Sequence, residues 1–333
     1  MSVACAKSRE PVEPAGFEPA LLALGQALPA AVHMGTSSWS FPGWRGLVWR
    51  DVHAQSQLSR HGLTAYSRHP LLRCVSLDRS FYRPLSANEY AAYAAQVPVH
   101  FRFVVKAPSL VCDALVRGGD GRGLQDNPAF LDPALASNQF VQPAVEGLGS
   151  KIGALVFQLS PLPQAWLSRL DEVLDRLSVM LAALPALKSV APGAVIAIEV
   201  RNPEFLTPAF AAVLRAAGAT YCLGLHARMP PIEQQLPMLR ALWPAPLVCR
   251  WSLNSRHGAY GYEQAKGLYE PFNRLQDPDP ATRRTLAKVI AATIGVALPV
   301  YVTINNKAEG SAPLSVIELA QAVLASGPAA GTS

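Results

Sequence analysis

The clearest candidates for chemistry lie in residues 195–203, where an apolar, largely β-branched run is followed by Glu199, Arg201 and Asn202. The apolar part has the composition of a strand that is buried on both faces. Side chains alternate along a strand, so Glu199 and Arg201 project from the same face and can pair or converge on a ligand. The stretch therefore predicts a core strand that ends in a charged site.

Polar residues also follow the other predicted strands. If those strands are parallel, their carboxyl ends meet on one side of the sheet and the polar residues form a ring there. Rim salt bridges explain one or two such residues but not a whole ring, which favours a functional site. For single members the structural interpretation stays open, as a buried Glu199–Arg201 pair or a structural His226. The ring comprises Thr36, Ser37, Trp39, Asp78, Ser80, Tyr82, Lys106, Gln158, Glu199, Arg201, His226, Arg250, Asn305, Asn306 and Lys307.

The candidate catalytic residues are Glu199, as a general base, with Lys106 and Asp78. Arg201 and Arg250 are candidate anion-binding residues, because a guanidinium can hold phosphate or carboxylate through two parallel hydrogen bonds. Two other interpretations of Lys106 are a desolvated amine that forms a Schiff base and an ion pair with Glu199 or Asp78. The other candidates for substrate binding are Ser37, Trp39, Tyr82, Gln158, Asn305 and Asn306.

These residue types predict a metal-independent, hydrolase- or isomerase-like enzyme for a small anionic substrate, which would be phosphorylated, a sugar or a carboxylate. The alternative is a non-catalytic protein that binds a ligand or a nucleic acid. Catalytic zinc needs about three protein ligands, and the strand ends offer only Asp78, Glu199 and His226, so we expect no tightly bound metal. No G-x-G-x-x-G turn follows the first strand, and we expect no cofactor.

Two stretches bear on the anionic partner. The loop after the last strand contains Lys307, Gly310 and Ser311 where barrels often bind phosphate, although such residues populate any loop. Seven arginines lie between Arg45 and Arg83, which allows a nucleic-acid surface with Trp39, Trp44 and Tyr82 as stacking platforms. Arginines spread over a solvated face, and aromatic side chains that anchor loops, are the alternative interpretation.

Composition indicates a cytoplasmic protein without a membrane partner. Of the 333 residues, 50% are hydrophobic and the net charge is +6, but every long apolar run is interrupted before the roughly 18–20 residues that a membrane span requires. Three glutamates near the N-terminus argue against a signal peptide. The five cysteines have no C-x-x-C spacing and are expected to be buried thiols in a reducing compartment. No protein partner is indicated.

Strand and helix patterns alternate along the chain. Eight repeats of this unit predict a single (β/α)8 TIM barrel, with an open doubly wound sheet as the fallback. We expect a partly disordered extension over residues 1–30, with residues 1–19 poorly ordered, then the barrel domain over 31–326 and a disordered tail over 327–333. Residues 117–133 are an irregular segment, either a lid or a tolerated insertion. The expected strands are 31–37, 74–82, 101–106, 154–159, 195–203, 220–225, 247–251 and 300–304. The expected helices include 20–28, 140–148, 166–184, 232–242 and 281–294, others that begin at Ser86 and Thr207, and a last one at Ser315.

Several motifs, taken in order, resemble the YecE-like family, a set of TIM-barrel proteins labelled domain of unknown function seventy-two. The resemblance covers about residues 33–324 and implies the barrel, but it implies no reaction because the family is uncharacterised. The motifs are G-T-S-S-W-S-F-P-G-W-R-G at 35–46, S-F-Y-R at 80–83, F-R-F-V-V-K-A-P at 101–108, L-V-F-Q-L at 155–159, E-V-R-N-P at 199–203, Arg250, N-N at 305–306 and A-P at 312–313.

This chain departs from the family pattern at several polar positions. Ser76 stands where the family usually has glutamate in the second strand, and Ser109, Cys112 and Asp113 replace an arginine followed by a Thr-His pair. Two further departures are Asn202 in place of a histidine and R-W-S-L at 250–253 in place of R-L-H-G. The resemblance therefore implies that this member lacks several acid–base groups of its relatives.

Overall fold

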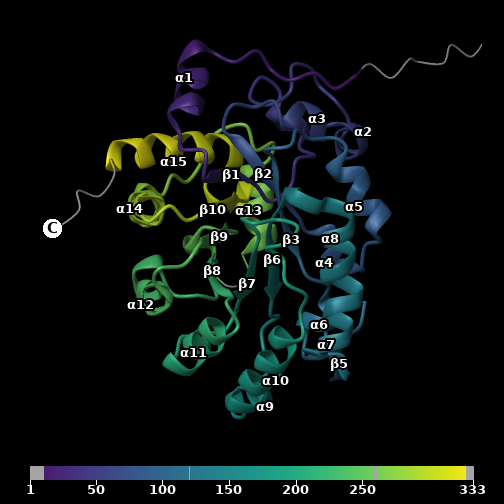
Figure 1. Cartoon of the computed structure of the whole chain (residues 1–333). Coiled ribbons are helices and arrows are strands. Elements are labelled where there is room, and N and C mark those ends of the chain that lie inside the picture. The colour runs from purple at the N-terminus through teal and green to yellow at the C-terminus, as the bar shows by residue number, and fades with distance from the viewer. Residues whose placement is uncertain (1–10, 120, 259–260, 328–333) are drawn as a thin grey trace, which may run out of the picture.

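In the computed structural model, which describes residues 11–119, 121–258 and 261–327, eight strands close into a parallel barrel (Figure 1). The neighbours around the barrel are β1-β10-β9-β8-β7-β6-β3-β2. This arrangement confirms the (β/α)8 barrel that the strand and helix alternation predicts. The strands are β1 (Val32–Thr36), β2 (Leu72–Leu77), β3 (Arg102–Lys106), β6 (Ile152–Gln158), β7 (Val195–Glu199), β8 (Thr220–Leu225), β9 (Leu247–Trp251) and β10 (Val300–Ile304).

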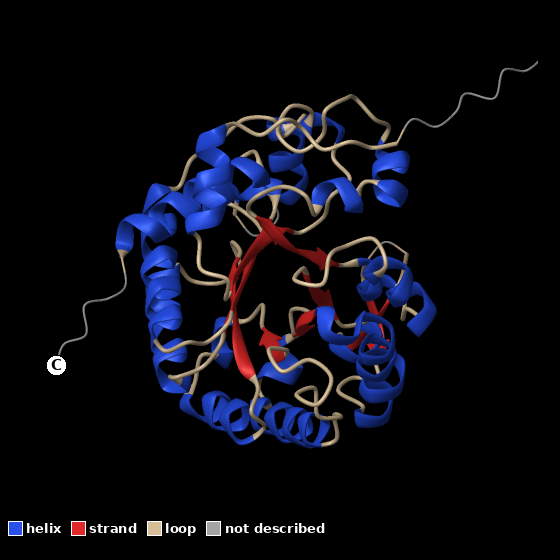
Figure 2. Cartoon of the chain, turned by 45° about the horizontal axis from the view of Figure 1, so that its top comes forward, coloured by secondary structure: helices blue, strands red, loops and turns tan. Residues whose placement is uncertain are grey.

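Two apolar layers hold the barrel together, and Figure 2 shows the helices surrounding the strands. Strand side chains alternate, so Ala154 and Val156 of β6 face the inner layer while Leu155 and Phe157 belong to the outer one. The inner layer consists mostly of small side chains, which suits the narrow interior of an eight-stranded barrel. Its members are Cys74, Val104, Ala154, Val156, Val195, Ala197, Cys222, Val248 and Tyr301.

Gly35 allows the first two strands to approach closely. A Cβ atom there would lie 1.8 Å from the carbonyl oxygen of Cys74, next to a register shift between β1 and β2. Any other residue would push the strands apart, because Cβ and a carbonyl oxygen cannot share that space.

Three of the described helices begin at caps that the sequence indicates. Ser86 and Glu89 form the expected capping box, and Thr207 and Asp279 accept hydrogen bonds from the first turns of their helices. The helices are α1 (Pro19–Ala27), α2 (Gln55–His61), α3 (Leu63–Tyr66), α4 (Arg79–Tyr82), α5 (Ala87–Ala94), α6 (Ser109–Cys112), α7 (Pro133–Ala136), α8 (Gln142–Leu148), α9 (Gln164–Leu167), α10 (Leu170–Ala182), α11 (Pro208–Ala216), α12 (Ile232–Leu242), α13 (Tyr262–Tyr269), α14 (Pro280–Gly295) and α15 (Ala312–Ser326).

The end of the second strand differs from the prediction. β2 stops at Leu77 instead of continuing to residue 82, and residues 79–82 form the single turn α4. The Ser80 hydroxyl donates to the carbonyl oxygens of Leu77, at 2.9 Å, and of Lys106 on β3, at 2.6 Å. These bonds, made partly across to β3, hold the turn in place.

Two predicted helix boundaries also differ. The helix expected over 166–184 is interrupted at Arg169, whose φ of −123° and ψ of 41° are not helical. The last helix begins at Ala312 rather than Ser315, because Pro313 occupies its first turn and Asn306 Oδ1 accepts a hydrogen bond from the Ala312 N–H at 2.8 Å.

The segment expected to be irregular, residues 117–133, overlaps a hairpin of β4 (Leu115–Arg117) and β5 (Gly123–Asp126). At the other end of the chain, residues 11–18 pack against the loop after β1, with Val12 and Ala15 buried, and are not the poorly ordered segment expected there. The order predicted for residues 1–10 and for the tail after Gly327 lies outside the described residues, as does Cys5. The described cysteines are free buried thiols, and no helix of the described chain has the length and apolarity of a membrane span.

Candidate functional site

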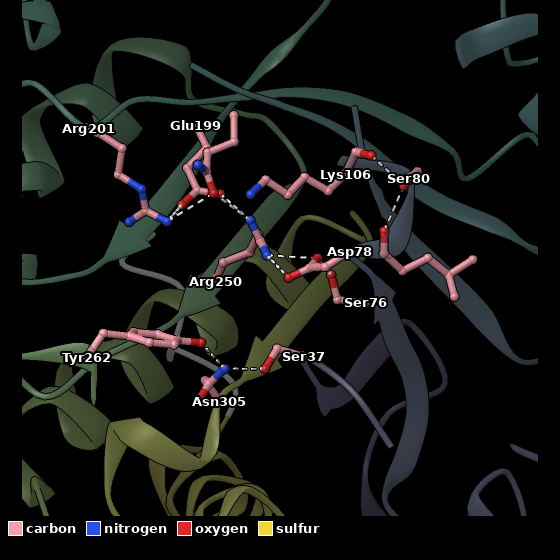
Figure 3. A network of polar contacts seen from close by, with 12 residues as sticks. Ser37, Ser76, Asp78, Ser80, Lys106, Glu199, Arg201, Arg250, Tyr262 and Asn305 are labelled. Atoms are coloured by element: carbon pink, nitrogen blue, oxygen red, sulfur yellow. Dashed lines mark hydrogen bonds and ion pairs between the residues drawn. The ribbon is translucent and has the colours of Figure 1, made fainter. Parts of the chain in front are cut away.

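Arg250 lies at the centre of the polar cluster at the carboxyl ends of the strands (Figure 3). From the end of β9, its Nη1 donates to Glu199 Oε2 on β7 at 2.8 Å. Its Nη2 donates to both oxygens of Asp78, which follows β2, at 3.0 and 2.8 Å. One guanidinium thus joins two carboxylates from different sides of the barrel.

Arg201 and Gln158 complete the side of the cluster formed by β6 and β7. Arg201 Nη2 lies 2.6 Å from Glu199 Oε1, which confirms that the two side chains pair as their alternation predicts. Gln158 Oε1 accepts hydrogen bonds from Arg201 and Arg250, each at 3.1 Å. The amide therefore holds the two guanidiniums on either side of Glu199.

Burial makes these ion pairs interdependent. Glu199 is fully buried, and Arg201 and Arg250 are 8% and 5% exposed. Burial alone would raise the pKa of Glu199, but the charges of Arg201 and Arg250 outweigh it and lower that pKa. Burial opposes the charge of Arg250 as well, yet Asp78 and Glu199 raise its pKa. Glu199 is therefore ionised and orients the arginines, a state in which it is a poor proton acceptor.

Lys106 is the cation of the cluster without a carboxylate partner. Its Nζ lies 3.4 Å from the centroid of the Phe81 ring, and no carboxylate of the described residues is within ion-pairing distance. Burial lowers the pKa of Lys106 to about 8, although Asp78 opposes the shift. The ion pair with Glu199 or Asp78 considered from the sequence is thus absent, and Figure 3 shows the amine directed toward Arg250 and Glu199.

The cluster retains capacity to bind an anion. Lys106, Arg201 and Arg250 carry three positive charges against two on Asp78 and Glu199, a net charge of +1 while Lys106 is protonated. Arg201 Nη1 and Arg250 Nε are buried and find no hydrogen-bond partner among the described residues. Buried donors without partners are unfavourable, and a bound anion would satisfy them.

A second polar group lies at the same end of the barrel. Asn305 Nδ2 donates to Ser37 Oγ at 2.7 Å and lies 3.2 Å from the hydroxyl of Tyr262 on α13 (Figure 3). Tyr82 is 82% exposed beside the cluster and makes an edge contact with Phe81. These side chains remain candidates for contacting a ligand.

Three other predicted ring residues are engaged in local structure. The Trp39 indole is buried and donates to the Leu58 carbonyl at 3.0 Å. Asn306 accepts from Trp44 and from the first turn of α15. His226 Nδ1 accepts from the Arg228 N–H, and burial, reinforced by the charge of Arg201, lowers the pKa of this histidine to about 4.

The phosphate site considered after the last strand is closed. Gly310 and Ser311 are buried, and Asn306 already accepts the first free N–H of α15. Lys307 points elsewhere, toward the Tyr262 ring.

The sequence did not identify Ser76, Phe81 and Tyr262 as parts of the site, and it placed Ser80 in the ring without its contact to β3. Ser76 donates to Asp78 Oδ1 at 2.6 Å and so orients that carboxylate. Ser80 donates a hydrogen bond to the backbone carbonyl of Lys106. The Phe81 ring contacts the amine of the same lysine. The S-F-Y-R motif at 80–83 indicated that these residues matter. Because residues up to 82 were expected to continue the strand, the turn that brings Ser80 to β3 was not predicted. Tyr262 is the first residue of α13 and does not lie at the end of a strand, so the pattern of polar strand ends gave no signal for it.

A cavity of about 660 Å³ opens beside Phe81. It is lined by the loops after β3 and β6 and by the β4–β5 hairpin, where Asp113 pairs with Arg117 at 2.5 Å. The hairpin therefore forms one wall of the space next to Phe81, whose ring contacts the Lys106 amine. Among the described residues, no group of three or more His, Cys, Asp or Glu side chains is arranged to hold a metal ion.

Comparisons with known proteins agree with this architecture. A family model described as "Protein of unknown function DUF72" matches residues 33–331, and no curated protein matches the chain. Two crystal structures of a DUF72 family protein from Enterococcus faecalis, at 2.52 and 3.10 Å resolution, are 17% and 16% identical to it and have TM-scores of 0.51. Their alignments cover 88% of this chain and 97% and 95% of those chains. A DUF72 family protein from Thermotoga maritima is 17% identical over 87% of this chain and 96% of its own, with a TM-score of 0.49. At such identities the E. faecalis structures show a shared fold alone.

Proposed function

The chain belongs to the DUF72 family, whose function is unknown, and from this premise we propose that it binds a small anionic molecule at the carboxyl ends of its barrel strands and acts on it as a hydrolase- or isomerase-like enzyme. The observation that carries the proposal is the Lys106 amine, which lies without a carboxylate partner beside two buried arginines.

Binding rests on charge and on free donors. A net charge of +1 in a buried cluster attracts an anion, and the unpartnered N–H groups of Arg201 and Arg250 give it directional contacts. Phosphorylated compounds, acidic sugars and carboxylates all offer suitable oxygens. Asp78 and Gln158 would orient the guanidiniums, while Asn305 and Tyr82 contact the less polar part of the ligand.

Catalysis is assigned to Lys106 rather than to Glu199. A general base works best when its pKa lies near the working pH, and the pKa of Lys106 is about 8, whereas that of Glu199 is lowered. The neutral amine would remove a proton from the bound anion or from a water molecule. Arg201 and Arg250 would stabilise the negative charge that develops.

The first experiment is a thermal-shift screen with sugar phosphates, small carboxylates, nucleotides and short DNA. Wild type is compared with Arg201→Met and with Arg284→Met, which removes an exposed arginine on α14 as a matched control. A ligand at a hundred times its Kd stabilises the protein by about 2.7 kcal/mol. The proposal requires a small anion that stabilises wild type and the control but not Arg201→Met; equal stabilisation of all three would contradict it.

Once such an anion is known, Lys106→Met separates catalysis from binding. We expect turnover to be lost and the anion's affinity to fall by no more than about tenfold, because the variant lacks the charge of Lys106 but keeps Arg201 and Arg250. The kcat/KM of wild type should rise with pH up to about 8. Retained turnover in Lys106→Met would overturn the catalytic assignment. DNA that binds with a steep salt dependence, while no small anion binds, would instead identify a nucleic-acid-binding protein.

A further inference from the structure

A second lysine at this end of the barrel also has no carboxylate partner. Lys307, in the loop after β10, is 8% exposed, and its Nζ lies 3.8 Å from the centroid of the Tyr262 ring and 5.9 Å from that of Phe272. No carboxylate of the described residues is within ion-pairing distance of this amine, and it donates no hydrogen bond to them. A nearly buried ammonium group in this setting is poorly compensated.

Lys307 lines a cavity of about 360 Å³ that is separate from the Arg250 cluster. None of the five charged cluster residues contributes to its wall. Its wall combines rings of phenylalanine and proline with four polar or charged side chains. The lining residues that would contact a ligand through apolar or charged groups are Phe41, Phe272, Gln55, Lys266, Glu270 and Lys307.

We propose that this cavity binds a small organic monocarboxylate with an apolar, ring-sized body. Its volume is that of a small-molecule site, and few polar groups set in an apolar wall are typical of such sites. Among the lining residues, Lys266 and Lys307 against Glu270 leave a net charge of +1, and Glu263 behind them adds a negative charge near Lys307, so a singly charged carboxylate suits the cavity better than a doubly charged phosphate. The carboxylate would contact the Lys307 amine while the apolar body packs on Phe41 and Phe272.

The lowered pKa of Lys307 is consistent with this assignment. Burial lowers it to about 8, and Glu263 opposes the shift while Lys266 adds to it. A carboxylate beside the amine would favour the charged form and raise the pKa again. Occupancy of the cavity is therefore measurable at the lysine itself.

The test measures binding of benzoate, its neutral analogue benzamide and phenyl phosphate to the whole protein by calorimetry. Three proteins are compared: wild type, Lys307→Met, and Lys288→Met, which removes an exposed lysine on α14. We expect benzoate to bind wild type and the control within twofold of each other, Lys307→Met to bind it at least tenfold more weakly, and benzamide and phenyl phosphate to bind wild type more weakly than benzoate.

Three results would overturn the proposal: no saturable benzoate binding to wild type, equal affinity in Lys307→Met, or equal affinity for benzamide. Tighter binding of phenyl phosphate would overturn the choice of a monocarboxylate. Because a variant can fail by misfolding, a second measurement uses wild type alone. The 13Cε resonance of Lys307 is titrated with and without benzoate, and an unchanged pKa contradicts the contact. Arg201→Met should leave benzoate binding intact, so this site and the proposed active site can fail independently.

Discussion

Replacing Lys106 by methionine should change how the stability of the protein depends on pH. Burial lowers the pKa of Lys106 in the folded protein from 10.5 to about 8, while the unfolded chain keeps the ordinary value. Below pH 8 both states are protonated, and wild type bears the full cost of the buried charge. Between pH 8 and 10.5 the unfolded chain binds more protons than the folded one, so the free energy of unfolding rises with pH.

The size of this effect follows from the two pKa values. From pH 8 to pH 10, a range of about two pH units, the lysine is largely neutral in the folded protein and largely protonated in the unfolded chain. Each pH unit in this range adds about 1.36 kcal/mol to the free energy of unfolding. Relative to Lys106→Met, wild type should gain about 2–3 kcal/mol over this range. Methionine is a suitable replacement because its thioether packs favourably against an aromatic ring such as Phe81.

Urea denaturation at pH 7, 8, 9 and 10 measures the difference between the two proteins. The other titrating groups, Lys307 included, are present in both and cancel in that difference. Lys288→Met, which removes an exposed lysine on α14, provides the control. A flat difference for Lys106→Met would refute the claim that the folded structure holds this amine at a lowered pKa.

Two further predictions concern stability alone. Arg250→Met leaves Asp78 and the buried Glu199 without their shared partner and should lower the free energy of unfolding by about 3–5 kcal/mol, with part of the loss recovered by adding Glu199→Gln; a loss below about 1 kcal/mol in urea denaturation would show that the ion pairs are not coupled. Gly35→Ala should lower the free energy of unfolding by about 3 kcal/mol or more, because its Cβ would lie 1.8 Å from a carbonyl oxygen. Gly267→Ala should raise the free energy of unfolding by about 0.5–1 kcal/mol, because the position is inside α13 and has open space around its Cβ. Melting temperatures that move in the same direction for both glycine variants would contradict the backbone argument.

Local patterns were sufficient to predict most of the barrel. Residues 195–198 are apolar on both faces of their strand, as in a covered parallel sheet, and in β7 all of them are buried except Ile196, which is partly buried. The caps at Ser86, Thr207 and Asp279 act within three residues of themselves, so the sequence places those helix starts correctly. Hydrophobic periodicity and capping depend on near neighbours, and near neighbours are visible in a sequence.

The misplaced elements depend on partners that are distant in the chain. The second strand stops early where Ser80 binds the carbonyl of Lys106, 26 residues away. The last helix starts early where Asn306 accepts its first N–H from across the preceding loop. The β4–β5 hairpin has Gly, Asp and Arg at exposed positions and lacks the alternation by which strands are recognised.

The residue types of the candidate site could be predicted from the chain, because parallel strands bring their polar carboxyl ends to one rim. The pairing of Glu199 with Arg201, two residues apart on one strand, could be predicted as well, but the pairing across the barrel could not. Arg250 joins Glu199, 51 residues away, to Asp78, 172 residues away, and this choice arises from which strands face each other across the closed barrel. The same closure leaves Lys106 and Lys307 on aromatic rings without carboxylates. Periodicity specifies the face on which a side chain lies, whereas ion pairing requires separations below 4 Å, which only the packed tertiary structure sets.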